Sequence, residues 1–336
     1  MTLNLAQIQQ ITTGAADVKW EEGAFWFYRF GEEQMEMYRQ RSQEFYLKAH
    51  CPSGVQLRFR TNSENLGLKT VVSRGCTRDY YAVEVFVNGK ELDALDNFRN
   101  ERLPQNYTVE KYTLEPREAV FALGAGEKEV RILLPWAVKL GLREVSLDDG
   151  ATLVPAIPER KILCFGDSIT QGYDAMYPSH KYVTRFAEYL GAAEYNKAIG
   201  GEIFYPELAA VKEKFDPDYI LVAYGTNDWS KCEREVLVDN CTRFYEAVCN
   251  TYPNAKVFAL TPIWRKASDT PKRGMEFSFV AELIRSATEK FENVTVIQGD
   301  ALVDADVNLY ADLRLHPNDA GFICYADRLI EAVKKG

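Results

Sequence analysis

Several features are missing from this 336-residue sequence, and each absence excludes a class of protein. Acidic residues outnumber basic ones, 49 against 40, which gives a formal net charge of −9. A chain without a basic excess is poorly suited to neutralise phosphates, so we expect neither a nucleic-acid partner nor a membrane partner. No apolar run approaches the length of a membrane span, and the first residues lack the pattern of a signal peptide.

Cysteine and histidine are used sparingly. The seven cysteines are scattered and form no C-x-x-C pair, which favours free thiols in a reducing compartment, so we expect a cytoplasmic protein. Three histidines without an H-E-x-x-H motif or clustered carboxylates predict no metal site, and we infer no cofactor. The G-x-S-x-G elbow of α/β-hydrolases is also absent, which disfavours that fold.

The two halves of the chain have different patterns. Before about residue 150, apolar and polar residues alternate over short stretches such as 55–60. Asn88-Gly89 lies between two apolar runs, which is a strong hairpin signal because both turn residues must take positive φ. Helical periodicity is nearly absent there. We therefore expect residues 1–150 to form an accessory all-β domain, a sandwich or jelly roll.

From residue 160 onward, strands and helices alternate. This order predicts an α/β domain over residues 151–336, with a parallel sheet covered by helices on both faces. The expected strands are 162–165, 195–199, 219–223, 256–261 and 294–298. The segment 148–159, which has two prolines and few periodic apolar residues, is the expected boundary between the domains.

Ligands bind beyond the carboxyl ends of the strands in such a sheet, so the residues that follow each strand are the informative ones. Four blocks stand at these positions: FGDSITQG (165–172), NKAIGGE (196–202), YGTNDW (224–229) and LHPNDAG (315–321). Together, in this order, they resemble the SGNH/GDSL hydrolase superfamily. Any single block is weak, whereas the four together are specific. The resemblance covers residues 160–336 and implies a three-layer α/β/α, flavodoxin-like domain.

The resemblance also implies roles for individual residues. Ser168 would be the nucleophile and His316 the general base that takes its proton and returns it to the leaving alcohol. The backbone N–H groups of Ser168 and Gly201, with the side-chain amide of Asn227, would form the oxyanion hole. In the family's N-x-G-x-x-G pattern, Ala198 replaces the first glycine and Gly201 matches the second, which makes its neighbour Gly200 the less favoured donor.

The position of the orienting acid also departs from the family pattern. The family's orienting Asp usually stands three residues before the His, but that residue here is Leu313, and Asp312 stands four before. Three alternatives remain open. Asp312 reaches Nδ1 of His316 through a one-residue bulge, or a backbone carbonyl holds the imidazole in a Ser–His dyad, or another acid takes this role or the enzyme is impaired.

Three further residues follow strands that carry the site. Trp229 is the last residue of the Asn block, and Trp264 and Arg265 follow the fourth strand. A Trp on a pocket wall can stack on a sugar ring, so these residues are candidates for substrate binding. The alternative is that each one packs between loops.

The two-domain layout is similar to that of family-two carbohydrate esterases and of related GDSL proteins with a jelly-roll front domain. The resemblance implies a serine esterase that hydrolyses short O-acyl esters, above all acetyl esters of carbohydrates, through an acyl-enzyme. Its partner would be a small-molecule or oligosaccharide ester. Two alternatives stay open: an acyltransferase with the same Ser and His, and a carbohydrate-binding protein in which the β domain is the working part.

Overall fold

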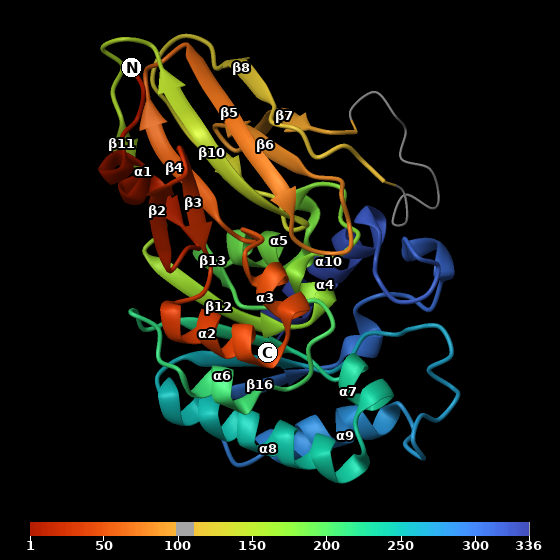
Figure 1. Cartoon of the computed structure of the whole chain (residues 1–336). Coiled ribbons are helices and arrows are strands. Elements are labelled where there is room, and N and C mark those ends of the chain that lie inside the picture. Colours follow the sequence, from red (N-terminus) through yellow and green to blue (C-terminus); the bar gives the residue numbers. More distant parts are fainter. Residues whose placement is uncertain (99–110, 336) are drawn as a thin grey trace. The chain divides into compact units, whose positions relative to one another are not determined.

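The computed structural model describes residues 1–98 and 111–335 (Figure 1). They form two compact units. The first comprises Met1–Glu159 with the short segments Met176–Ser179 and Ala193–Tyr195, and the second comprises the rest of the chain from Arg160 onward. None of the helices within the described residues combines the length and hydrophobicity needed to cross a bilayer.

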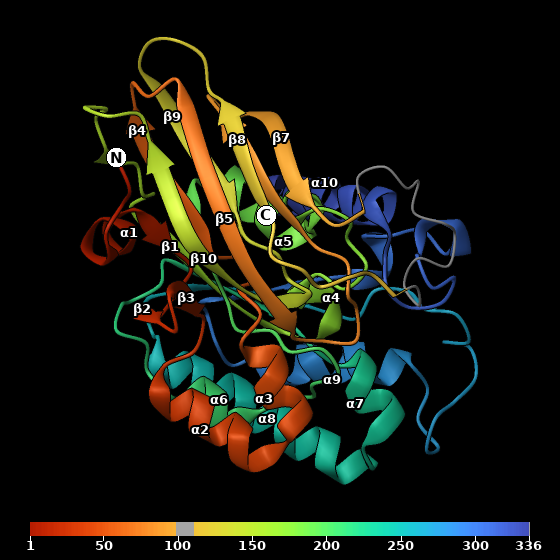
Figure 2. The same cartoon turned by 45° about the horizontal axis from the view of Figure 1, so that its top comes forward.

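The first unit contains two antiparallel sheets. Their strand orders are β1-β4-β9-β6-β7, with β11 also paired to β4, and β2-β3-β10-β5-β8. The first sheet consists of β1 (Thr12–Thr13), β4 (Gln56–Thr61), β9 (Lys128–Leu133), β6 (Ala82–Val87), β7 (Lys90–Asp96) and β11 (Val154–Pro155). The second consists of β2 (Asp17–Glu21), β3 (Ala24–Tyr28), β10 (Val138–Leu147), β5 (Asn65–Arg74) and β8 (Glu118–Ala122). Figure 2 shows the long strands β5 and β10 side by side. The predicted β-sandwich is confirmed.

The local sequence explains why strands and a hairpin form in this unit. Alternate residues of β5, such as Leu66 and Leu68, are buried, as expected for a strand with one face on a core. The predicted hairpin joins β6 to β7, and Asn88 and Gly89 have φ values of 50° and 77°. These positive values fit the right-handed twist of the two strands.

The expectation that this half contains almost no helix is wrong. The described residues of this half include three helices: α1 (Leu5–Ile11), α2 (Glu32–Arg41) and α3 (Gln43–Ala49). Helix α2 buries only Gln34 and Tyr38, so it has no apolar stripe that periodicity could reveal. It forms instead from strong helix formers, with acidic residues in its first turn and basic residues in its last, which complement the helix dipole.

The predicted parallel sheet is present, and its strands belong to the second unit except for residues Ala193–Tyr195 of the edge strand β13. Its strand order is β13-β12-β14-β15-β16, and the pairs β12–β14, β14–β15 and β15–β16 are parallel. The strands are β12 (Arg160–Gly166), β13 (Ala192–Asn196), β14 (Tyr219–Ala223), β15 (Lys256–Leu260) and β16 (Val294–Ile297). Strand β13 begins three residues before the expected position, although Lys197 and Ile199 still donate to carbonyls of β12.

Helices cover both faces of this sheet (Figure 1). Helices α5 (Tyr182–Tyr189) and α10 (Asp319–Lys335) pack together on one face, while α6 (Pro206–Ala210), α8 (Arg234–Thr251) and α9 (Ser278–Thr288) lie on the other. Strand β12 serves both layers: Cys164 joins the core with α5 and α10, and Phe165 packs against Phe244 of α8 with ring centroids 5.5 Å apart. The three-layer α/β/α architecture is confirmed.

Gly166, the last residue of β12, lies at the carboxyl edge of the sheet. Strand order reverses between β12 and β14, and such a switch point is where ligands bind in doubly wound sheets. At the end of β12, a Cβ on Gly166 would lie 2.4 Å from Oγ1 of Thr170 and 2.9 Å from the carbonyl oxygen of Ala223. Glycine therefore allows the chain to turn directly into the short helix α4 (Ser168–Gln171).

Candidate active site

Ser168 is the first residue of α4, at the carboxyl end of β12. Its neighbour Asp167 caps the helix, because the Asp167 carboxylate accepts the N–H of Ile169 at 2.9 Å. The Ser168 hydroxyl is therefore not used for capping. It lies instead 2.8 Å from Nε2 of His316, in the hydrogen-bonded geometry that a Ser nucleophile and its base require.

The carboxylate of Asp312 reaches the other nitrogen of the same imidazole, with 2.9 Å between Oδ2 and Nδ1 of His316. The extra residue between them is accommodated by Leu313, whose φ is 54°. Oδ1 of Asp312 accepts the backbone N–H groups of Arg314, Leu315 and His316, which fixes the turn. This is the geometry of the bulged alternative.

Electrostatics agree with this arrangement. Burial alone would raise the pKa of the Asp312 carboxyl, but the hydrogen bond and the charge of His316 outweigh burial and hold it well below its usual value. Asp312 is thus kept as a carboxylate, the form that orients an imidazole and stabilises an imidazolium.

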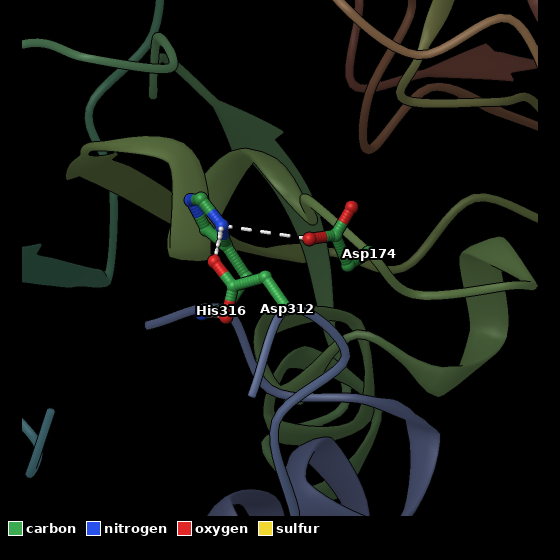
Figure 3. Close-up of side chains that lie close together, drawn as sticks. All are labelled: Asp174, Asp312 and His316. Carbon is green, nitrogen blue, oxygen red and sulfur yellow. Dashed lines mark hydrogen bonds and ion pairs between the residues drawn. The ribbon is translucent and has the colours of Figure 1, made fainter. Parts of the chain in front are cut away.

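A second carboxylate, Asp174, lies at the same imidazole nitrogen, and no sequence signal identified it. Its Oδ2 is 3.4 Å from Nδ1 of His316, and its side chain is fully buried. Figure 3 shows Asp312 and Asp174 approaching this nitrogen from different directions. Asp174 lies two residues after the first block (165–172), in the loop that follows α4. An isolated Asp at such a place has no distinctive spacing.

Asp174, Asp312 and His316 are also possible ligands for a metal ion. The candidate ligand atoms of Asp174, Asp312 and His316 all lie within 4.8 Å of one another. A metal at Nδ1 would displace the hydrogen that Nδ1 donates to Asp312. Three protein ligands with an open position can suit a catalytic metal, but here the imidazole is already held between Ser168 and a carboxylate. The geometry fits an ion-paired base.

Hydrogen-bond donors without acceptors surround Ser168. Among the described residues, none accepts the backbone N–H of Ser168 or of Gly201. The N–H of Gly200, by contrast, donates to Oε1 of Gln171 at 2.7 Å, which agrees with the preference for Gly201. Gly201 has a φ of 92°, a conformation that favours glycine.

Asn227 supplies a third donor. It lies in helix α7 (Thr226–Lys231), which follows β14 on the other side of the switch point. One hydrogen of its amide binds the carbonyl oxygen of Glu202 at 3.0 Å, which orients the group. An amide nitrogen carries two hydrogens, and within the described part of the chain the second has no acceptor. This set of donors is suited to an oxyanion.

Two buried acids hold the loops around these donors. Burial raises the pKa of Asp228 to about 7 and that of Asp167 to about 6. Asp228 accepts the backbone N–H groups of Phe204 at 2.9 Å and Gly225 at 3.1 Å. Because these oxygens are occupied by backbone donors, both acids position loops.

The three candidates for substrate binding have different surroundings. Trp229 is fully buried and donates its Nε1–H to the carbonyl of Met275 at 2.9 Å. Arg265 is also buried, donates to Thr226, and lies 5.3 Å from the Trp229 ring, and burial lowers its pKa. The structure thus places both in packing between loops, the alternative to substrate contact.

Trp264 differs from these two residues. It lines a cavity of about 530 Å³ with Phe277, Glu282 and Arg285, at the carboxyl ends of β15 and β16. Its ring also contacts Tyr310, with centroids 5.3 Å apart, so part of the side chain packs while part faces the cavity. Of the three candidates, Trp264 has the position from which a ligand could be contacted.

Comparisons of the whole chain with solved structures agree with the fold. A salicylyl-acyltransferase, SsfX3, from a tetracycline biosynthetic pathway aligns with 96% of this chain and 94% of its own, at a TM-score of 0.78 and 19% identity. A family-two carbohydrate esterase from Clostridium thermocellum in complex with cellohexaose aligns with 84% and 92%, at a TM-score of 0.62 and 18% identity.

An acetyl xylan esterase, Est2A, from the rumen bacterium Butyrivibrio proteoclasticus aligns with 84% of this chain and 89% of its own, at a TM-score of 0.57 and 17% identity. The chain has no match among curated proteins. The model of the GDSL-like lipase/acylhydrolase family matches residues 164–322. The four sequence blocks and the arrangement of their residues at the sheet edge lie in this region. Residues 164–322 therefore form a GDSL-like lipase/acylhydrolase domain, and the chain is a carboxylic-ester hydrolase.

Proposed function

We propose that the chain is a serine esterase that removes short acyl groups, above all acetyl groups, from hydroxyls of carbohydrates. One observation carries the proposal: the imidazole of His316 joins the Ser168 hydroxyl at 2.8 Å to the Asp312 carboxylate at 2.9 Å. This arrangement activates an otherwise weak nucleophile.

The proposed reaction has two steps. First, Nε2 of His316 takes the hydroxyl proton while Oγ of Ser168 bonds to the ester carbonyl carbon, and the N–H groups of Ser168 and Gly201 with the Asn227 amide bind the oxyanion. The carbon–alcohol bond then breaks, and His316 returns the proton to the leaving alcohol. Second, water attacks the acyl-enzyme by the same route, which releases the acid and restores Ser168.

Carbohydrate esters are the proposed substrate class because two kinds of support converge. The fold aligns with carbohydrate esterases, including one in complex with cellohexaose, along most of the chain. The cavity beside Trp264 offers an aromatic ring together with carboxylates and an arginine, which suits the apolar face and the hydroxyls of a sugar. In the cytoplasmic location that the sequence predicts, the substrates would be small acylated sugars or glycosides.

Acyl transfer is the second candidate. It is favoured by the alignment of 96% of this chain with a salicylyl-acyltransferase. The acyl-enzyme would be the same, and a hydroxyl of an acceptor would replace water in the second step. A thioester donor with a panel of acceptor alcohols separates the two functions, because a transferase forms the new ester faster than it releases the free acid.

The deciding experiment measures acetate release from acetylated mono- and oligosaccharides and from an aryl acetate. Wild type, Ser168→Ala and the control Ser286→Ala, an exposed serine on α9, are compared. We expect release by wild type and the control and none by Ser168→Ala. Equal release by all three proteins would refute the role of Ser168. If transfer exceeds hydrolysis, the esterase proposal gives way to the transferase.

A further inference from the structure

Two carboxylates, not one, lie at Nδ1 of the imidazole that binds Ser168. We infer that Asp174 is a second positioning residue for His316, acting beside Asp312. The inference rests on the proposed function, since it concerns the base that activates Ser168. It adds a residue that lies outside the four sequence blocks and away from the position of the family's orienting Asp.

The two carboxylates differ in distance and burial. Oδ2 of Asp312 is 2.9 Å from Nδ1 of His316 and its side chain is 23% exposed, whereas Oδ2 of Asp174 is 3.4 Å away and its side chain is not exposed at all. A single Nδ1–H directs its strongest hydrogen bond to the nearer acceptor, Asp312. Asp174 therefore contributes mainly its charge, which water screens little because the side chain is buried.

The surrounding chain holds Asp174 in this place. Its φ is 74°, in the left-handed region that non-glycine residues rarely adopt. The preceding residue, Tyr173, packs its ring against the imidazole, with centroids 5.5 Å apart and a tilt of 30°. A Cβ on Gly200 would lie 2.5 Å from that ring, so glycine at this position leaves room for Tyr173. A strained backbone next to a packed ring keeps the carboxylate at the imidazole.

The chemical consequence concerns the moment when Ser168 attacks. His316 then holds a second proton and becomes an imidazolium, and a buried negative charge 3.4 Å from Nδ1 stabilises this form. If Asp312 is removed, the same Nδ1–H has a remaining carboxylate acceptor within reach. The two acids are thus partly redundant, and their effects on the activation of Ser168 should be strongly non-additive.

The test follows Ser168 itself and needs no acyl substrate. A fluorophosphonate reacts with an activated serine: the Ser168 Oγ–P bond forms, the P–F bond breaks, fluoride leaves, and His316 takes the hydroxyl proton. The rate of modification is measured against pH for wild type, Asp174→Asn, Asp312→Asn and the double variant. Asp239→Asn, which changes an exposed carboxylate on α8, is the matched control.

We expect each single change to slow modification by about tenfold and the double change to slow it by more than about 10³-fold. In Asp174→Asn, the slowing should appear across the pH profile, because a negative charge next to the imidazolium is lost. Asn and Gly both tolerate the left-handed backbone at residue 174. Asp174→Gly therefore provides a second variant that removes the carboxylate without straining the chain.

The inference is overturned if folded Asp174→Asn and Asp174→Gly react like wild type at every pH, and the double variant reacts like Asp312→Asn. This result leaves the proposed function intact, provided that wild type reacts and Ser168→Ala does not. If wild type itself fails to react with the probe, Ser168 is not activated, and both the proposed function and this inference are wrong.

Discussion

Nε2 of His316 lies 2.8 Å from Oγ of Ser168, although 148 residues separate the two in sequence. A hydroxyl and a base in this geometry act as a unit, so loss of either one removes the same step. We expect Ser168→Ala and His316→Ala each to lower kcat for an aryl acetate by at least about 10⁴-fold, and the double variant to be no worse than either. Steady-state kinetics check this. Losses that multiply in the double variant would mean that the two residues act independently.

Asn227 offers a test of the oxyanion hole. Asn227→Ala removes one donor that is oriented by the carbonyl of Glu202, and we expect kcat to fall about 10²- to 10³-fold with little change in KM. Asn250→Ala, an exposed asparagine on α8, serves as the control. An increase in KM at unchanged kcat would instead indicate that Asn227 binds the ground state of the substrate.

Leu313 tests how the extra residue between Asp312 and His316 is accommodated. Because its φ is 54° and its side chain is 38% exposed, glycine should fit there at least as well as leucine. We expect Leu313→Gly to retain activity and to be neutral or stabilising by about 1 kcal/mol. Leu313→Val, which is β-branched, should lower both Tm and kcat. A loss of activity in the glycine variant with normal activity in the valine variant would refute this account of the turn.

Substitution of Trp229 distinguishes a role in packing from a role in substrate contact. Its ring is fully buried and its Nε1–H binds the carbonyl of Met275, so we expect Trp229→Ala to cost about 3–5 kcal/mol in urea unfolding. Trp264→Ala, at the cavity, should change stability less and should raise KM for a sugar ester. A stable Trp229→Ala protein with a raised KM would restore Trp229 as a residue that contacts substrate.

The raised pKa values of the buried acids Asp228 and Asp167 predict how the stability of the protein depends on pH. Burial raises the pKa of Asp228 from 3.8 to about 7 in the folded chain. Between these values the unfolded chain has lost this proton and the folded chain still holds it, so the free energy of unfolding falls as pH rises, by up to about 1.4 kcal/mol per pH unit. Asp167, raised to about 6, adds to the fall below that pH.

Urea unfolding at several pH values between 5 and 8 checks this dependence. Asp228→Asn lacks the titrating group, so its free energy of unfolding should fall less steeply with pH than that of wild type, whatever its absolute stability. Above pH 8, the two slopes should coincide. Equal slopes over the whole range would show that Asp228 does not hold its proton in the folded chain.

Much of the α/β unit could be predicted because its signals are local. Strand β14 (Tyr219–Ala223) coincides with the expected strand 219–223, since a short apolar run determines it. Helix α2 (Glu32–Arg41) could not be found in this way, because it buries too few apolar residues to give a periodic pattern.

In the candidate site, too, only the residues that stand in local motifs could be predicted from the sequence. Ser168, His316, Gly201 and Asn227 stand in motifs, and the structure brings the hydroxyl, the imidazole and the donors to one sheet edge. Asp174 belongs to no motif, since it reaches the imidazole only through the turn after α4 and the packing of Tyr173. Trp229 ends a motif but is fully buried, with its Nε1–H bound to the carbonyl of Met275, and spacing alone does not reveal such packing.

The short segment Met176–Ser179 belongs to the first unit although the sequence around it belongs to the second. Within the first unit, the buried carboxylate of Glu84 on β6 accepts both the backbone N–H and the hydroxyl of Ser179, each at 2.7 Å. A cut after Glu159 would therefore remove two hydrogen-bond donors from a buried carboxylate, which is costly. The β-sandwich of this protein is thus not a module that could be gained, lost or exchanged by recombination at a single linker. Both units must be inherited together.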